Sequence, residues 1–340
     1  MSSLPKTYKA CVITEANKPW TLRDVPLQHP SKGQILVKIL ACGVCFSDVA
    51  VGTGHMGDVF PRVPGHEIVG DVVEVGDDVP NFQNGDRVGG PWHGGHDRTC
   101  RQCQRAQFQM CDNKVINGVS QDGGFAEYVL LRAEAVVRVP KEIDPAEAAP
   151  LLCAGVTVFN SMRKLHVEQG SLVAVQGLGG LGHLAVQYAN KMGYEVAALS
   201  SGDDKAEFAK ELGAHHYINT KKTDAAAELN KLGGASIIVQ TAPNPKAISP
   251  LVAALAPEGT LLSLAPVGPV EVDTVALVSK GAKVAGWPSG HAIDSEQAIQ
   301  FAMRHGIKCM IERYPLDKVQ DAVDSLLAGK PRFRNVLVMQ

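Results

Sequence analysis

The sequence lacks the features of a membrane protein and of a secreted one. No segment approaches the roughly 18 consecutive apolar residues that a membrane-spanning helix requires. Residues 1–9 are polar, without the apolar core of a secretory signal, and no lipidation motif is present. The formal net charge of −2 leaves no excess of either sign to favour nucleic acid or a membrane surface as a partner. We therefore expect a cytoplasmic protein with neither of those partners.

Cysteine is also scarce. Eight cysteines in 340 residues are too few for a disulfide-stabilised scaffold, and their clustering indicates metal binding in a reducing compartment. At about 150 residues per domain, the chain length suggests two domains. Each would be large enough to bury a core of its own.

The apolar patterning divides the chain into a β-rich part and an alternating part. In the first ~140 residues we expect strands at 7–14, 35–42 and 68–76 and within 125–138, followed by helices near 145–149 and 156–165. Further on, the predicted strands are 172–176, 194–199, 216–218, 236–240, 260–265 and 282–286, and the predicted helices are 180–192, 203–212, 223–231, 246–255 and 273–279. This alternation predicts an α/β fold with a doubly wound parallel sheet. A helix at 294–304, a strand at 309–313, a helix at 317–327 and a strand at 334–339 end the chain, and the last strand is a candidate to rejoin the first domain.

A glycine-rich turn follows the first strand of the alternating part. The apolar run Leu172–Val175 predicts a buried parallel strand, and residues 183–192 have helical spacing. The turn between them has the Gly-x-Gly-x-x-Gly pattern of dinucleotide-binding sites, in which glycines permit a tight turn, the approach of a pyrophosphate and close helix packing. The helix N-terminus would offer N–H groups to the phosphates. The candidate cofactor-binding residues here are Gly177, Gly179, Gly180, Leu181 and Gly182.

A first set of candidate metal ligands is dispersed along the chain. It consists of Cys45, His66 with Glu67, and Cys153. Spacing alone does not group these residues, but Cys45 follows a predicted strand and His66 precedes another. Three protein ligands would leave a zinc ion one open position, as a catalytic site requires.

A second set of candidate ligands is local. It consists of Asp97, Cys100, Cys103 and Cys111, within a loop of about residues 92–113. Three cysteines at this spacing indicate a closed structural zinc site. Asp97 stands where the spacing favours a fourth cysteine, and a carboxylate oxygen can bind zinc, so Asp97 is the predicted fourth ligand. His93 and His96 are the alternatives.

Several of these motifs occur together in one known family. They are Gly43-Val-Cys45-x-Ser47-Asp48, Gly65-His66-Glu67, Cys153 followed by Thr157, and the glycine turn. In this combination the whole chain resembles the zinc-dependent medium-chain dehydrogenase family, especially its alcohol dehydrogenases and cinnamyl-alcohol-dehydrogenase-like members. The resemblance implies a GroES-like catalytic domain over 1–154, a Rossmann cofactor-binding domain over 155–288 and a return to the first domain over 289–340.

The resemblance also implies roles for individual residues. Cys45, His66 and Cys153 would hold a catalytic zinc, Asp48 would hydrogen-bond His66, and Glu67 would lie near the metal on the side away from substrate. The other implied roles are proton transfer for Ser47, a nicotinamide contact for Thr157, a pyrophosphate contact for Arg334, and substrate-pocket positions for Phe46 and Trp92. The implied reaction is hydride transfer between a primary alcohol, aromatic or allylic alcohols included, and a nicotinamide cofactor. A homo-oligomer, either a dimer or a tetramer, is the expected assembly.

The sequence departs from the family pattern at three positions. Phe46 replaces the usual His or Arg after the zinc cysteine, so one phosphate contact is lost. Ala50 occupies the position of a relay histidine in many members, and His55 is a weak substitute for it. The proton would then leave through Ser47 and the cofactor ribose to water. Asp97 in place of a cysteine is the third departure.

Cofactor choice depends on the end of the second strand of the alternating part. NAD-preferring proteins carry an acidic residue there, which bonds the ribose hydroxyls. Ser200 and Ser201 stand at that place, and Lys205 follows nearby, so we expect NADP(H), with NAD(H) as the alternative. Asp203 and Asp204 argue against NADP(H), unless they serve only to cap the next helix.

Taken together, the sequence predicts a zinc-dependent alcohol dehydrogenase or aldehyde reductase, with one catalytic and one structural zinc. The alternatives are an NAD-dependent alcohol or polyol dehydrogenase, a zinc-free enoyl or quinone reductase, and a non-catalytic nucleotide-binding protein on the same fold. The intact ligand trio argues against the zinc-free reductases and the non-catalytic protein. The structural-zinc loop argues mildly against the polyol enzymes.

Overall fold

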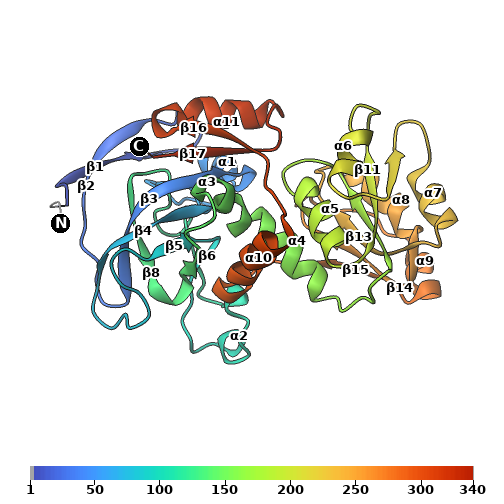
Figure 1. The fold of residues 1–340 in the computed structure, drawn as a ribbon, viewed down its shortest axis with the longest axis horizontal. Helices are drawn as coiled ribbons and strands as arrows, with labels where there is room; N and C mark the ends of the chain where they lie inside the picture. The colour runs from blue at the N-terminus through green and yellow to red at the C-terminus, as the bar shows by residue number, and fades with distance from the viewer. Residues whose placement is uncertain (1–3, 340) are drawn as a thin grey trace. The chain divides into compact units, whose positions relative to one another are not determined.

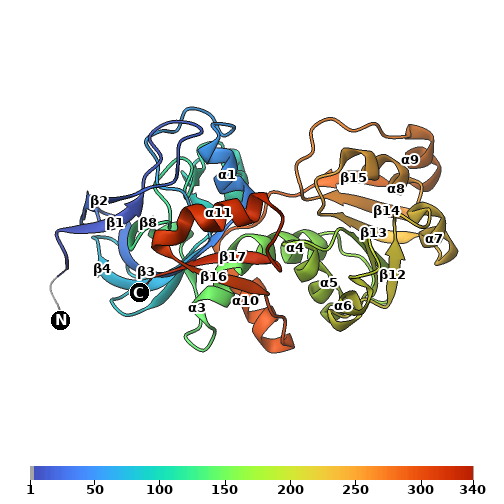
Figure 2. The same ribbon diagram turned by 90° about the horizontal axis from the view of Figure 1, so that it is seen from above.

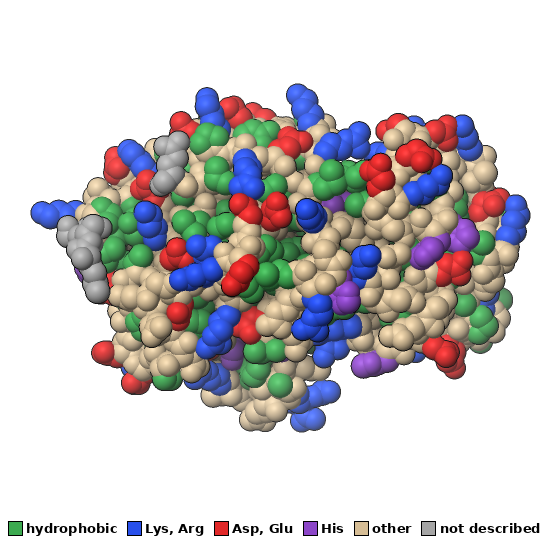
Figure 3. Space-filling model, viewed as in Figure 1, with side chains coloured by type: hydrophobic (Ala, Val, Ile, Leu, Met, Phe, Trp, Pro, Cys, Tyr) green, Lys and Arg blue, Asp and Glu red, His purple; other side chains and the backbone are tan. Residues whose placement is uncertain are grey.

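The computed structural model describes residues 4–339, and the chain divides into two compact units. Of the described residues, the first unit comprises 4–156, 290–303 and 308–339, and the second comprises 157–289 and 304–307. No helix in the described part of the chain is long and apolar enough to cross a membrane. Acidic and basic side chains are interspersed over the face drawn in Figure 3, in keeping with the near-neutral net charge.

The first unit is built on a mixed seven-stranded sheet of order β16-β17-β3-β4-β5-β9, with β8 also paired to β3. Buried apolar side chains from both ends of the chain, such as Ile35, Phe125 and Val323, form its core. The unit also holds two separate two-stranded sheets, β1-β2 and β6-β7. The strands of the whole unit are β1 (Thr7–Cys11), β2 (Leu22–Pro26), β3 (Gln34–Val44), β4 (Ile68–Val75), β5 (Arg87–Gly90), β6 (His93–Gly95), β7 (Val115–Ile116), β8 (Tyr128–Arg132), β9 (Val137–Arg138), β16 (Ile311–Pro315) and β17 (Arg334–Val338).

Helices of different lengths lie between and around these strands. They are α1 (Phe46–Gly52), α2 (Arg101–Gln104), α3 (Pro145–Ala148), α10 (Ala292–His305) and α11 (Val319–Leu327), with the 3₁₀ helices η1 (Phe108–Met110), η2 (Ala133–Ala135), η3 (Ala149–Leu152) and η5 (Leu316–Lys318). Helix α4 (Ala154–Arg163) follows η3 and leads into the second unit.

The C-terminal strand β17 lies beside β3, from the N-terminal part of the chain. Strand β17 pairs antiparallel with β3, with Asn335 opposite Val44 and Val338 opposite Ala41. Figure 1 shows this as a red strand next to a blue one, and Figure 2 shows α11 lying over β17. The pairing brings Arg334, the first residue of β17, close to the end of β3, where the first set of candidate ligands begins.

The second unit is a parallel six-stranded sheet of order β12-β11-β10-β13-β14-β15. Helices cover both of its faces, as Figures 1 and 2 show, which is the doubly wound arrangement that the alternating pattern predicts. Its strands are β10 (Leu172–Gln176), β11 (Glu195–Ser200), β12 (His216–Asn219), β13 (Ala235–Gln240), β14 (Leu255–Ser263) and β15 (Lys283–Gly286). Its helices are α5 (Gly182–Lys191), α6 (Ala206–Glu211), α7 (Ala225–Lys231), η4 (Pro245–Ala247), α8 (Ile248–Val252) and α9 (Thr274–Lys280).

Two local predictions are wrong. The helix predicted over 246–255 ends at Val252, because the buried Leu255 pairs with Ala235 and begins strand β14. Helix α1, which begins directly after Cys45, is absent from the prediction. Its seven residues include Phe46, Val49 and Val51, and the segment is too short to show a helical period.

Candidate active site

The first ligand set is assembled around the junction between β3 and α1. Cys45 is the N-cap residue of α1, and its backbone N–H donates to Asp48 Oδ2 at 2.8 Å. Asp48 therefore holds the helix N-terminus that carries Cys45 and Ser47. Gly43 precedes this turn, where a Cβ would lie 1.8 Å from Glu67 Oε2, so only glycine leaves room for the Glu67 side chain.

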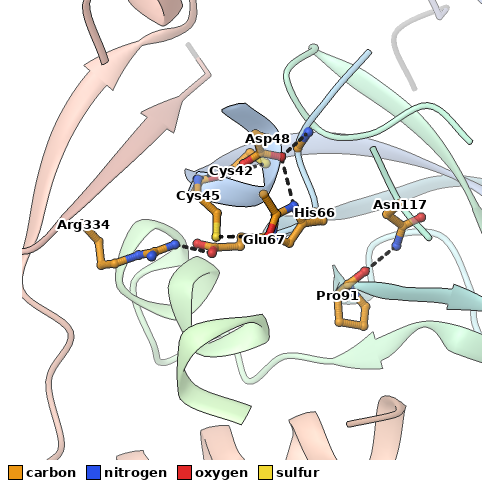
Figure 4. A network of polar contacts seen from close by, with 11 residues as sticks. Cys42, Cys45, Asp48, His66, Glu67, Pro91, Asn117 and Arg334 are labelled. Carbon is orange, nitrogen blue, oxygen red and sulfur yellow. Dashed lines mark hydrogen bonds and ion pairs between the residues drawn. The ribbon is translucent and has the colours of Figure 1, made fainter. Parts of the chain in front are cut away.

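Asp48 also fixes the histidine of the set. Its Oδ1 accepts from Gly65 N at 3.0 Å and lies 2.9 Å from His66 Nδ1. Both side chains are 1% exposed. With Nδ1 engaged by the carboxylate, the other ring nitrogen, Nε2, is left as the atom that can bind a metal. Figure 4 shows the carboxylate of Asp48 between the Cys45 turn and the ring of His66.

The four candidate ligands converge. One donor atom from each of Cys45, His66, Glu67 and Cys153 lies within 4.8 Å of the others. His66 Nε2 and Glu67 Oε2 are buried without a hydrogen-bond partner in the described chain. Buried polar atoms are otherwise almost always paired, and thiolate, imidazole and carboxylate are the groups that zinc binds. The donor set therefore fits a zinc ion.

Charge in this buried cluster is balanced by Arg334. Its guanidinium pairs with Glu67 Oε1, as Figure 4 shows, and the two side chains are 4% and 0% exposed. Burial raises the pKa of Glu67 to about 7, while Arg334 acts in the opposite direction. A hydrogen bond from Cys153 and the positive neighbours His66 and Arg334 hold the pKa of Cys45 well below its ordinary value, despite burial. The predicted contact of Arg334 with a cofactor pyrophosphate stays a prediction.

Of the remaining predicted residues of the first unit, Ser47 and Trp92 contact the cluster. Ser47 Oγ lies 3.9 Å from Cys45 Sγ, and the ring of Trp92 meets His66 edge-on at a centroid distance of 4.9 Å. Phe46, on the first turn of α1, is 58% exposed. Ala50 lies further along α1. His55 is exposed and bonded to Thr53 Oγ1 at 2.7 Å, an arrangement expected of a surface side chain.

The second ligand set also converges. Donor atoms of Asp97, Cys100, Cys103 and Cys111 lie within 4.8 Å of one another. Cys103 and Cys111 are buried, whereas Asp97 and Cys100 are partly exposed. Backbone hydrogen bonds from Cys100 and Thr99 and one from the Asn113 side chain hold the pKa of Asp97 far below its ordinary value. Asp97 is thus the fourth member of this group, and three thiols with a carboxylate fit a zinc ion.

The two alternative ligands lie in a ring stack instead. His93 stacks on His96 at 5.2 Å, and His96 stacks on Phe108 at 4.3 Å. Burial lowers the pKa of His93 to about 3, so this imidazole is neutral at physiological pH. Sequence reasoning missed this stack because β6, which begins at His93, has only three residues and is too short to show a strand period.

In the second unit, the glycine turn follows β10 as predicted. Gly177 has φ +97°, and a Cβ on Gly182 would lie 1.9 Å from Gly177 O, so glycine is required where α5 begins. A Cβ on Gly179 would meet no atom within 4 Å, which leaves open space over the turn. Gly180 and Leu181 complete the turn before α5. The turn therefore has room for a phosphate at a helix N-terminus. Thr157, the predicted nicotinamide contact, lies in α4 and belongs to the same unit.

The end of β11 carries the residues predicted to set cofactor choice. Ser200 is its last residue, Ser201 is exposed, and Lys205 is the N-cap residue of α6. The interpretation of Asp203 and Asp204 as caps of α6 is wrong, because no side chain makes a cap hydrogen bond there. Asp203 Oδ1 instead accepts from Asn219 Nδ2 at 2.8 Å, and Oδ2 pairs with Lys222.

Comparisons with known proteins bear on both units. The alcohol dehydrogenase GroES-like domain model matches residues 31–141, and the zinc-binding dehydrogenase model matches residues 180–304. The chain is 54% identical to "Alcohol dehydrogenase patD" of Penicillium expansum over 338 residues, 99% of both chains. These models and the observed sheets confirm the predicted fold class, a Rossmann sheet with a GroES-like β-rich domain.

Solved structures of alcohol dehydrogenases have a similar fold. A cinnamyl alcohol dehydrogenase from Sorghum bicolor matches with a TM-score of 0.88 at 32% identity, over 98% of both chains. The cinnamyl alcohol dehydrogenase of Helicobacter pylori, solved with NADP(H), matches with a TM-score of 0.85 at 26% identity, also over 98% of both. With a full-length relative at 54% identity and both domain models matched, the chain belongs to the zinc-dependent medium-chain dehydrogenase/reductase family.

Proposed function

We propose that the protein is a zinc-dependent alcohol dehydrogenase or aldehyde reductase. It transfers hydride between a primary alcohol, aromatic and allylic alcohols included, and NADP(H). The observation that carries the proposal is the converging set of Cys45, His66, Glu67 and Cys153, with His66 Nε2 buried and unpaired. The alcohol dehydrogenase relatives support the reaction class.

Each residue of the cluster has a separate task in this proposal. A zinc ion held there supplies Lewis acidity toward an alcohol or carbonyl oxygen. Asp48 orients His66 and, through the Cys45 N–H, holds the cysteine in place. Ser47 Oγ, beside Cys45 Sγ, accepts the alcohol proton during oxidation and returns one during reduction. Arg334 balances the negative charge of Glu67, so a carboxylate can stay buried next to Cys45 and Cys153.

The preference for NADP(H) rests on the end of β11. Ser200 and Ser201 offer hydroxyl donors where a carboxylate would repel a 2′-phosphate, and Lys205 adds a positive charge nearby. Of the two nearby acids that would oppose a phosphate, Asp203 is engaged by Asn219 and Lys222, whereas Asp204 still favours the alternative, NAD(H). The relative from Helicobacter pylori, solved with NADP(H), supports the same choice.

A cofactor comparison tests this preference. The kcat/KM for each cofactor is measured with a panel of aromatic, allylic and aliphatic primary alcohols, and the dissociation constants of NADPH and NADH are measured by fluorescence. We expect NADP(H) to bind more tightly and to react with higher kcat/KM. Ser200→Asp is expected to reverse the preference through repulsion of the phosphate, and Lys205→Ala to raise KM for NADP alone. Higher kcat/KM with NAD would favour the alternative, an NAD-dependent alcohol or polyol dehydrogenase.

Metal analysis tests the zinc sites separately. Protein purified without chelators is expected to carry zinc at both ligand sets, the His66 set catalytic and the Asp97 set structural. Zinc content is compared among wild type, Cys153→Ala and Cys103→Ala, and each variant should lose one zinc equivalent relative to wild type. If Cys153→Ala retains all of its zinc, the proposed catalytic centre is wrong. If Cys103→Ala retains all of it, the structural site is wrong.

We also propose a homo-oligomer, a dimer or tetramer, that covers an apolar surface on the second unit. Helix α9 contains no buried residue, and its Val275 and Val278 are 74% and 83% exposed. It packs against β14, the strand next to the edge strand β15, whose Val284 is 39% exposed. A second copy at this surface would bury these side chains and protect the edge.

Light scattering is expected to show a dimer or tetramer, and Val278→Lys is expected to yield a smaller species. A monomeric wild type would contradict the proposal.

A further inference from the structure

The exposed side of the second ligand set depends on a residue that is not itself a metal ligand. Asn113 lies two residues after Cys111, and its side-chain Nδ2 donates to Asp97 Oδ2 at 2.7 Å. Its backbone N–H donates to Cys111 Sγ at 3.3 Å. One residue thus contacts two of the four candidate ligands.

The hydrogen bonds of Asp97 decide which of its oxygens is left for a metal. Oδ1 accepts from the backbone N–H groups of Thr99 at 2.8 Å and Cys100 at 3.0 Å. A carboxylate has about four lone-pair sites, two on each oxygen. These two bonds occupy Oδ1, and the Asn113 amide takes one site on Oδ2. A single acceptor site, on Oδ2, remains.

We propose that Asn113 is the positioning residue that makes Asp97 a one-oxygen metal ligand. By holding Oδ2 from one side, its amide keeps the remaining acceptor site available to the group formed with Cys100, Cys103 and Cys111. Without the amide, Oδ2 turns freely toward water, because Asp97 lies at the partly exposed edge of the group. Hydrogen-bond partners of metal ligands are worth about 10–100-fold in metal affinity. This inference rests on the proposed structural zinc site.

The backbone contact of Asn113 with Cys111 Sγ can be separated from the side-chain contact with Asp97. Cys111 Sγ also receives the Asp97 backbone N–H at 3.5 Å, so two backbone amides contact this sulfur. Substitution of the Asn113 side chain leaves these backbone donors in place. A change in metal binding on Asn113→Ala would therefore report the contact with Asp97.

A double-mutant cycle tests the proposal. Wild type, Asn113→Ala, Asp97→Cys and the double variant are compared for zinc release to a chromophoric chelator, with Asp112→Ala, an exposed neighbour, as control. We expect Asn113→Ala to speed release of one zinc by about 10–100-fold and Asp112→Ala to leave the rate unchanged. In the Asp97→Cys background, where no carboxylate is left to orient, Asn113→Ala should have no effect. An equal effect in both backgrounds, or a wild-type rate in Asn113→Ala, would overturn the proposal.

A second readout does not depend on release rates. In protein with Co²⁺ at this site, Asp97→Cys is expected to intensify the thiolate charge-transfer absorption, because a fourth sulfur joins the donor set. Asn113→Ala should change the ligand-field bands only when Asp97 is present. If Asn113→Ala yields no folded protein, recovery of folding in the double variant supports the proposal and failure there overturns it. Absence of zinc at this site in wild type would instead refute the proposed structural zinc site.

Discussion

The two candidate metal centres lie in the same unit, yet they are built in opposite ways. Cys45, His66 and Cys153 come from three segments far apart in the chain, and β3, β4 and η3 must pack before these residues meet. The donors of the other centre come from one short loop, Asp97 to Cys111. The first centre is therefore a product of the fold, whereas a metal ion bound at the second would close a local loop.

The two centres also differ in burial and in the groups that contact their donors. His66, Glu67 and Asp48 are almost completely buried, and an ion pair with Arg334 balances the charge. Asp97 and Cys100 are partly exposed, and backbone N–H groups and Asn113 supply their contacts. Preorganised buried donors suit a site that performs chemistry, and local closure suits a site that contributes stability. Removal of each centre should thus have a different consequence.

Loss of a ligand from the buried centre is expected to have the largest effect. In Cys153→Ala, kcat/KM should fall by about four orders of magnitude, because Lewis-acid stabilisation is worth several kcal/mol and 1.36 kcal/mol corresponds to tenfold. The fold should be largely kept, since the surrounding strands are held by the core. Steady-state kinetics and circular dichroism melting check this. A drop in melting temperature as large as that of Cys103→Ala would contradict the distinction between the two centres.

Ser47→Ala should have the next largest effect. It removes the hydroxyl beside Cys45 Sγ without changing a metal ligand, so zinc content should equal that of wild type. General acid–base assistance is worth about 10²–10⁴-fold, and we expect a loss of kcat for alcohol oxidation on the order of 10²–10³-fold. The measurement is kcat with metal analysis, and Ser47→Thr, which keeps a hydroxyl, is the matched control. Equal losses in both variants would argue against proton transfer through Ser47.

Loss of a ligand from the loop centre should lower the thermal stability of the protein. Cys103→Ala is expected to release one zinc and to lower the melting temperature by about 6–12 °C, which corresponds to about 3 kcal/mol for a domain of this size. Activity at 25 °C should stay within about twofold of wild type if the loop only stabilises. Calorimetry with excess zinc and with a chelator checks this. Unchanged melting in the presence of chelator would show that the loop does not depend on metal.

Local signals made the fold and much of the site predictable. The Val- and Ile-rich strands alternating with helices and the glycine turn predict the second unit, and the cysteine spacing predicts the loop group including Asp97. The dispersed ligands could be grouped only by resemblance to a family, since no spacing rule joins Cys45 to Cys153. Their convergence is observed, and their binding of zinc stays a prediction.

Features that depend on tertiary contact were missed. The pairing of Arg334 with Glu67 arises because β17 lies against β3, and nothing near either residue in the sequence indicates it. The role of Asn113 was also missed, although its place two residues after Cys111 is a usable signal. Capping of α6 by Asp203, an option that the sequence left open, does not occur: its partners are Asn219, the last residue of β12, and Lys222, which local sequence does not indicate.

The smallest expected effect concerns proton release from the buried centre. The loop centre is partly open to water, whereas the buried one has Ala50 on α1, where a histidine would provide a relay. With an unperturbed pKa near 6.5, a histidine in Ala50→His is neutral above that pH and able to accept a proton. We expect kcat for alcohol oxidation to rise about threefold near pH 7–8. The gain should vanish below pH 6, where the imidazole is protonated, and above pH 9, where water and hydroxide accept the proton unaided. Ala50→Asn, polar but not titratable, is the control; an equal gain there, or an unchanged pH–rate profile in Ala50→His, would show that proton release does not limit this enzyme.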